Sequence, residues 1–206
     1  MLLDSPLNDI FGQHSKVKIL RFLVQSQSQL NGREIAKNVG LSHVKAHTAL
    51  KDLTRQGVVS MRSAGSSLVY WLNEDHFLVK EIIRPAFEKE EGLFEYISRL
   101  ILKQISPPRP LSIILFGSFA KGNASADSDI DVVIIYPRSK SKTVISKELS
   151  EAEKKITSFF GNRLSGVPLL ADEFLKKLKA KDAFIHEIIR GGKVIYGKSI
   201  TELTGL

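Results

Sequence analysis

The chain has 206 residues, of which 43% are hydrophobic and 25% are charged, and it contains no cysteine. This length suits one large domain or two small ones, and the hydrophobic fraction argues against wholesale disorder. The missing cysteine excludes disulfides, thiolate metal sites and a cysteine nucleophile, while a net charge of +8 points to polyanionic partners such as nucleic acid or nucleotide phosphates.

The first twelve residues, MLLDSPLNDIFG, have no basic region followed by a long apolar run, so they do not resemble a signal peptide. No stretch approaches the ~18 consecutive apolar residues that cross a bilayer. We therefore expect a cytoplasmic protein without membrane contact.

The N-terminal third is predicted to contain three helices and a β-hairpin. Apolar periodicity indicates helices over 16–24 and 33–39, and a third helix that Ser42 caps and Gly57 ends. Two β-rich runs then flank the turn at 63–66. Helical periodicity returns over 75–104, where Pro85 marks a break or a fresh first turn.

The third helix has an apolar side and a basic side. At about 100° per residue, Ala46, Leu50 and Leu53 point inward. The opposite side is basic and rich in hydrogen-bonding groups, which suits a helix in the major groove of DNA. Arg62, beside the hairpin turn, is placed to reach a phosphate or the minor groove. The expected DNA-contacting residues are therefore His47, Thr48, Lys51, Arg55 and Arg62, with Val44 on the same outward side.

The stretch REIAKNVGLSHVKAHTALKDLTRQGVV resembles the helix-turn-helix and wing of MarR- and ArsR-like regulators, over about residues 15–72. The resemblance implies DNA binding by a homodimer that reads two half-sites, with the 75–104 helix as a plausible seam. A winged helix that serves only protein contacts is the alternative. His43 and His47 have the i, i+4 spacing of a helical metal chelate, but no acid completes the pattern, so groove or surface contacts are favoured.

The prolines in Ser106–Pro110 cannot continue a helix and divide the chain. The sequence thus predicts a winged-helix domain over 1–74, a linker helix over 75–106 and a second domain over 107–206. In the second domain, strands and helices alternate, which makes the fold class α+β with an α/β C-terminal half. The expected strands are 111–116, 130–136, 167–170 and 193–196, and the expected helices are 143–160, 172–179 and 183–190.

The most informative motif runs from Gly117 to Asp131. Gly117 allows a close backbone approach to a triphosphate, and the Ser118 hydroxyl and nearby amides donate hydrogen bonds to phosphate oxygens. Asp129 and Asp131, two positions apart on a strand, face the same way and repel each other unless a divalent cation lies between them. Lys121 is a further candidate phosphate contact, and Asp127 is expected in a turn.

The stretch GSFAKGNASADSDIDVVI resembles the DNA polymerase β-like nucleotidyltransferases, in particular their minimal branch, over about 107–199. The resemblance implies Mg²⁺ bound by Asp129 and Asp131, and an NTP, for which we expect ATP. It also implies transfer of NMP to a hydroxyl, which in minimal nucleotidyltransferases can be a tyrosine of a HEPN-type partner protein. The alternative is a transcriptional regulator that senses a nucleotide with a catalytically weak or inactive domain.

The sequence departs from this family pattern at the third carboxylate. The expected strand, Gly166–Leu170, contains no acid, and Pro168 occupies or adjoins the usual position. Asp172 and Glu173 follow, either as cap residues of a helix or as substitute ligands. The basic stretch Pro137–Lys142 is either a solvated loop or a flexible lip that attracts nucleotides or nucleic acid.

Overall fold

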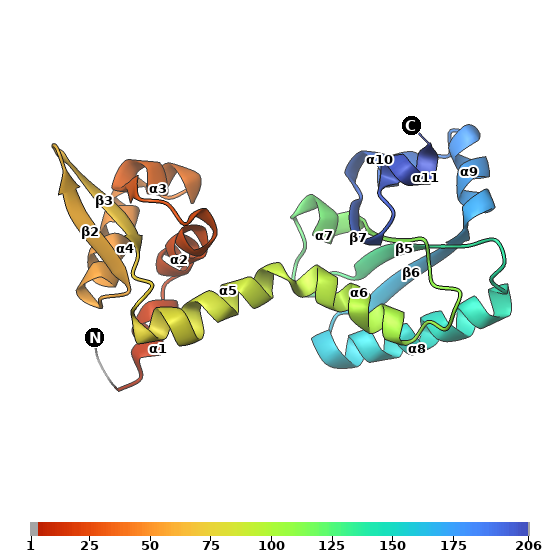
Figure 1. The fold of residues 1–206 in the computed structure, drawn as a ribbon, viewed down its shortest axis with the longest axis horizontal. Helices are drawn as coiled ribbons and strands as arrows, with labels where there is room; N and C mark the ends of the chain where they lie inside the picture. Colours follow the sequence, from red (N-terminus) through yellow and green to blue (C-terminus); the bar gives the residue numbers. More distant parts are fainter. Residues whose placement is uncertain (1–3, 206) are drawn as a thin grey trace. The chain divides into compact units, whose positions relative to one another are not determined.

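The computed structural model describes residues 4–205, and the chain forms two compact units, over 1–91 and 92–206 (Figure 1). This division falls inside the linker helix expected over 75–106. Helix α5 (Arg84–Glu91) buries Phe87 in the first core, whereas α6 (Leu93–Lys103) buries Ile97 and Ile101 in the second, with Gly92 between them. No helix in the described part is long and apolar enough to span a membrane.

The N-terminal unit has the predicted winged-helix order. The three expected helices and the hairpin are confirmed, and Ser42 caps the third helix by accepting a hydrogen bond from the Lys45 amide at 3.4 Å. Ala46, Leu50 and Leu53 are buried as expected. Its elements are α1 (Pro6–Phe11), α2 (His14–Ser26), β1 (Leu30–Asn31), α3 (Gly32–Asn38), α4 (His43–Arg55), β2 (Val59–Ala64), β3 (Ser67–Leu72) and the π-helix η1 (Val79–Ile83), followed by α5.

The C-terminal unit contains a mixed sheet in the order β6-β5-β4-β7. β4 runs antiparallel to β5 and β7, and β5 runs parallel to β6. β6 is longer than predicted, because an edge strand tolerates the glycine and proline that break its pattern. The elements after α6 are β4 (Ser112–Leu115), α7 (Gly117–Lys121), β5 (Ile130–Tyr136), α8 (Lys142–Phe160), β6 (Leu164–Leu170), α9 (Ala171–Lys179), α10 (Ala183–Gly191), β7 (Lys193–Gly197) and α11 (Ile200–Thr204).

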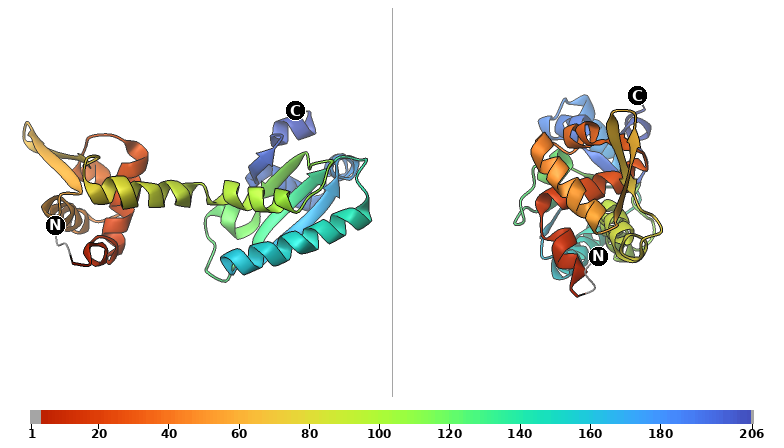
Figure 2. Two further views of the ribbon diagram at one scale, coloured as in Figure 1. Left: turned by 60° about the horizontal axis from the view of Figure 1, so that its bottom comes forward. Right: turned by 90° about the vertical axis from the view of Figure 1, so that its left-hand side faces the viewer.

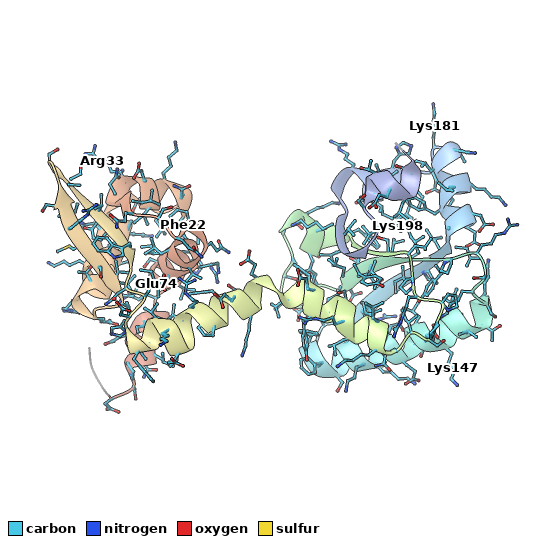
Figure 3. All side chains as sticks on the ribbon, viewed as in Figure 1. Phe22, Arg33, Glu74, Lys147, Lys181 and Lys198 are labelled. Atoms are coloured by element: carbon cyan, nitrogen blue, oxygen red, sulfur yellow. The ribbon has the colours of Figure 1, made fainter. Side chains whose placement is uncertain are left out.

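The two faces of this sheet carry different helices (Figure 2). Val132 and Ile134 of β5 pack with α6 and α8, whereas Val133 and Ile135 pack with α9 and α10. Charged side chains such as Lys147 and Lys181 point away from the unit (Figure 3). Since successive strand residues alternate, Asp131 shares the face of Val133, at the end of the sheet where β5 begins.

Candidate functional site

The turn after β4 lies against the carboxylate of Asp131. Gly117 opens α7 with φ at 68°, and a Cβ atom at this position would lie 2.3 Å from Asp131 Oδ2. Only glycine combines this backbone with that contact at low cost. We expected Gly117 to admit a triphosphate, but the group beside its Cα is the Asp131 carboxylate. Gly117 and Asp131, from the two ends of the motif, are therefore neighbours.

Asp129 and Asp131 lie unneutralised at this end of the sheet. Asp129 directly precedes β5 and is exposed, while Asp131 is half-buried. Across residues 4–205, no side chain forms an ion pair or hydrogen bond with either carboxylate. Carboxylate oxygens are the ligands that a hard divalent cation prefers, so these two residue types fit Mg²⁺. Asp127 lies in a turn, as expected.

The strand beside this pair supplies no third acid. In the parallel register, Ser165 lies beside Asp131, and Pro168 lies beside Ile134, three positions further along and on the opposite face. The expectation that Pro168 marks the missing position is therefore wrong. No group of three or more acidic or histidine side chains suited to a metal occurs among the described residues.

Asp172 and Glu173 cannot replace the missing ligand. They follow β6, whose end pairs with Tyr136, whereas Ser165 near its start pairs with Asp131. The end of β6, where Asp172 and Glu173 follow, therefore lies five strand residues, or roughly 16 Å, from the position beside Asp131. Glu173 caps α9 instead, because its Oε2 accepts a hydrogen bond from the Leu170 amide at 3.0 Å.

Lys121 forms an ion pair with Glu187 of α10. Its Nζ lies 2.7 Å from Glu187 Oε1, and both side chains are more than half exposed. Exposed pairs of this kind contribute about 0–1 kcal/mol, so Glu187 holds Lys121 only weakly. Arg163 is exposed immediately before β6, and its carbonyl oxygen accepts a hydrogen bond from the Ile130 amide at 2.8 Å.

The basic stretch Pro137–Lys142 is a solvated loop, as one of the two interpretations expects, except at Lys140. Lys140 is buried, with its Nζ 2.8 Å from Glu148 Oε2. The other two cations of the stretch also face acids, since Arg138 Nε lies 3.8 Å from Asp172 and Lys142 Nζ lies 2.5 Å from Glu173. Both interpretations of this stretch are therefore wrong for Lys140, and the local positive charge is matched.

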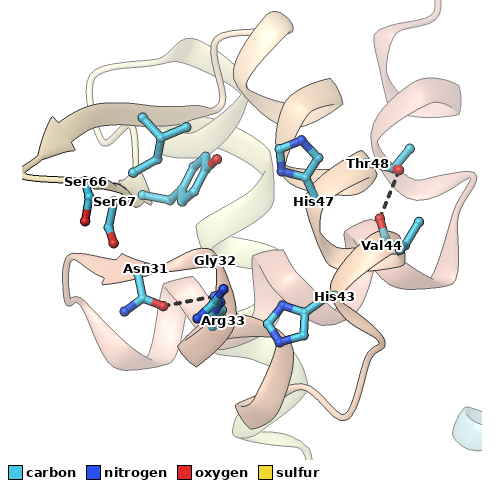
Figure 4. Close-up of a pocket in the computed structure, with 11 residues that line it drawn as sticks. Asn31, Gly32, Arg33, His43, Val44, His47, Thr48, Ser66 and Ser67 are labelled. Atoms are coloured by element: carbon cyan, nitrogen blue, oxygen red, sulfur yellow. Dashed lines mark hydrogen bonds between the residues drawn. The ribbon is translucent and has the colours of Figure 1, made fainter.

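In the N-terminal unit, the outward side of α4 borders a groove of about 710 Å³ (Figure 4). His47 and Thr48 line it, together with groups from the start of α3 and from the tip of the wing. No acidic residue of the described chain is among its lining side chains. The polar lining residues include Asn31, Arg33, His43 and Ser67.

The remaining three DNA-contacting candidates lie outside this groove. Lys51 is exposed, and Arg55 is exposed with its guanidinium 3.3 Å from Asp52. Arg62 donates a hydrogen bond to Gln29 Oε1 at 2.9 Å. Its register partner is Val69, whereas the groove is lined by the strand neighbours Leu68 and Tyr70. Arg62 therefore belongs to the opposite face of the wing.

Sequence reasoning missed several residues around both sites. Asn31 and Arg33 are remote from the third helix along the chain, and the strand pairing that brings β1 beside the wing has no local signal. Asn162 contacts the loop before Asp129 across more than 30 residues. A glycine–asparagine pair after a helix indicates a helix end, but not a contact at that distance.

Residues 95–190 match the model of a family described as "Nucleotidyltransferase domain". No curated protein matches the sequence significantly. Part of the chain is similar to the AntR antimony-specific transcriptional repressor, with 17% identity and a TM-score of 0.36, over 45% of this chain and 78% of that chain.

The chain is also similar to a mutant of the toxin–antitoxin MntA–HpeT, with 18% identity and a TM-score of 0.41, and to a toxin–antitoxin with AMP-PNP, with 19% identity and a TM-score of 0.40. Each similarity covers 54% of this chain and 81% of the other. Residues 95–190 thus match a nucleotidyltransferase domain family, and they follow a region with the element order of a winged helix.

Proposed function

We propose that the C-terminal unit binds an NTP with Mg²⁺ and transfers NMP to a hydroxyl acceptor, with release of pyrophosphate. The observation that carries this proposal is the contact between Gly117 and Asp131. It joins the two halves of the motif, and neither Asp129 nor Asp131 has a side-chain partner in the described chain.

In this proposal, Asp129 and Asp131 hold the cation, and the Ser118 hydroxyl and the amides beside Gly117 donate hydrogen bonds to the triphosphate. Lys121 exchanges Glu187 for a phosphate oxygen. When bound, Mg²⁺ neutralises phosphate charge and polarises the phosphorus that the acceptor attacks. ATP is the proposed donor, and a hydroxyl on a HEPN-type partner protein is a proposed acceptor.

A nucleotide-sensing domain without transfer is the second candidate. The observation that favours it is Ser165, which lies beside Asp131 where a third carboxylate would stand. A serine hydroxyl neither ligates Mg²⁺ as a carboxylate does nor takes the proton of an attacking hydroxyl at neutral pH. In this second candidate, the C-terminal unit binds the nucleotide without transferring it, and nucleotide binding changes the DNA affinity of the N-terminal unit.

We expect the double variant Asp129→Asn/Asp131→Asn to lose at least about a thousandfold of Mg²⁺-dependent label transfer from NTP to acceptors in cell extract, because the charge stabilisation by the cation is lost. Asp127→Asn, in the turn of the same loop, is the matched control and should retain activity. Tight NTP binding by the wild type without transfer to any acceptor would establish the sensing function instead. Equal transfer by the wild type and the double variant would contradict transfer by this site.

For the N-terminal unit we propose DNA binding, by a homodimer that reads two half-sites. The observation that supports it is the groove beside α4, whose described lining offers hydrogen-bond donors and one arginine but no acid. Phosphate oxygens accept hydrogen bonds only, so a lining of this kind suits a nucleic-acid backbone. Lys51 and Arg55 extend the positive charge along α4, and Arg62 is proposed to contact a second backbone segment.

Lys51→Ala and Arg55→Ala should each weaken DNA binding at all sequences and lower the slope of log affinity against log salt by about 1, because each removes one phosphate contact. Mobility shifts across a salt series measure both quantities. Lys89→Ala on the exposed side of α5 is the control and should leave the slope unchanged. Unaltered affinity in both α4 variants would show that this side of the helix does not face DNA.

A further inference from the structure

The loop that leads into Asp129 is held by one side chain from a distant segment. Asn162 follows Gly161, where α8 ends, and its Nδ2 donates hydrogen bonds to two backbone carbonyl oxygens of the loop. The distances are 2.8 Å to Ala126 and 3.0 Å to Ser128. Both amide hydrogens of one side chain are thereby used on the same loop.

The rest of this loop is held by bonds within itself. The Ser125 amide donates to Ser128 Oγ at 2.9 Å, and the Ser128 amide donates to the Ser125 carbonyl at 3.1 Å. In the described chain, Asn162 is the only side chain from outside the loop that bonds to residues 124–129. Ordering a loop of small polar residues costs conformational entropy, which these hydrogen bonds must offset. Asn162 therefore holds the loop on the near side of Asp129, while the bond from the Ile130 amide to the Arg163 carbonyl holds the chain on the far side.

The contact with Ser128 acts directly on Asp129. The carbonyl of Ser128 and the amide of Asp129 belong to one planar peptide group, so fixing the carbonyl oxygen fixes that plane. The Cα atom of Asp129, from which its side chain leaves, lies in the same plane. Asp131 is fixed from the other side, by β5 and by Gly117.

We propose that Asn162 is a positioning residue for the cation site: it sets the peptide before Asp129, so that the carboxylates of Asp129 and Asp131 converge on one divalent cation. This proposal rests on the proposed function of the C-terminal unit. Asn162 itself touches neither cation nor nucleotide. Removal of the Asn162 side chain keeps both aspartates in the chain but lets the Asp129 carboxylate turn away from the cation.

The test compares the full chain with Asn162→Leu, which keeps the size of the side chain and removes its donors, and with Asn162→Ala. Mn²⁺ binding is measured by electron paramagnetic resonance, with and without a non-hydrolysable ATP analogue, and loop order by amide hydrogen exchange over 124–130. We expect faster exchange and about tenfold weaker Mn²⁺ binding in both variants, the effect of losing two hydrogen bonds. Metal-free binding of the analogue should stay unchanged.

Thr204→Val is the control. It removes the hydrogen bond from the Thr204 hydroxyl to the Ile200 carbonyl in the same unit, and should change neither the loop exchange nor the Mn²⁺ affinity. Faster loop exchange with unchanged Mn²⁺ affinity would overturn the proposal and leave the proposed function intact. Unchanged loop exchange would overturn it as well. A wild type that binds neither Mn²⁺ nor the analogue would refute the proposed function, and this proposal with it.

Discussion

Gly117→Ala is expected to abolish Mn²⁺-dependent nucleotide binding by the C-terminal unit. Asp131→Ala is expected to have the same effect. The new methyl group would lie 2.3 Å from Asp131 Oδ2, closer than non-bonded atoms approach, and 3.2 Å from its Cγ, which is a tight contact. The carboxylate must therefore swing away, or the turn must move and carry Ser118 with it. Either movement separates the cation ligands from the phosphate-binding turn. Calorimetric titration with Mn²⁺ and a non-hydrolysable ATP analogue measures the loss.

The matched control for this experiment is Gly122→Ala, at the other end of α7. Gly122 has nearly the same backbone as Gly117, with φ at 73°, but nothing lies within 4 Å of its hypothetical Cβ. Both variants carry the strain of an alanine at positive φ, which is about 1 kcal/mol. Only Gly117→Ala meets the carboxylate. Equal binding by the two variants would show that the contact with Asp131 has no role in the site.

The same contact explains why this part of the site could be predicted from the sequence. β4, α7 and β5 follow one another, and β4 pairs with β5 directly, so the motif residues meet through a short connection. Their residue types alone indicate that two carboxylates and a phosphate-binding turn lie together. The outward side of α4 was predictable for a similar reason, because helical periodicity fixes which residues lie opposite a buried stripe.

The third strand of the site could not be placed in this way. β6 follows the 19-residue α8, and no tight turn fixes its register against β5. A shift of one residue reverses which side chains face Asp131, so the position of Pro168 gave no reliable guide. Ser165 emerges as the neighbour of Asp131 only once the pairing is known. Parallel pairing across a helix is set by the whole core.

Lys140 shows a different limit of sequence reasoning. Three cations alternate with polar residues after β5, and this pattern normally indicates a solvated loop. Glu148 lies two turns into α8, and Ser106 precedes the prolines, so neither partner is visible in the local pattern. Lys140 Nζ bonds to Glu148 and to the Ser106 carbonyl, and the Ser106 amide bonds to Glu148 at 2.9 Å. The loop thereby fixes the segment that enters β4.

Glu148→Gln is expected to destabilise the C-terminal unit by about 3–5 kcal/mol, because it leaves the ammonium of Lys140 buried without its counter-charge. Lys140→Met/Glu148→Leu removes both charges and should cost far less. The exposed pair of Glu151 and Lys154 on the same helix supplies the control, since Glu151→Gln should change stability by at most about 0.5 kcal/mol. Amide exchange in β5 reports this unit, whereas fluorescence of Trp71, the one tryptophan, reports the N-terminal unit.

The buried pair also predicts how stability depends on pH. Burial raises the pKa of Glu148, but hydrogen bonds from Lys140 and Ser106 lower it by more, so its pKa lies below the ordinary value. An acid with a lowered pKa stabilises the fold fully above its unfolded pKa of about 4.3 and loses this contribution as the pH falls through the folded value. The wild type should therefore lose stability below that pH more steeply than Lys140→Met/Glu148→Leu. Parallel acid profiles for the two proteins would mean that the pair does not stabilise the unit as an ion pair.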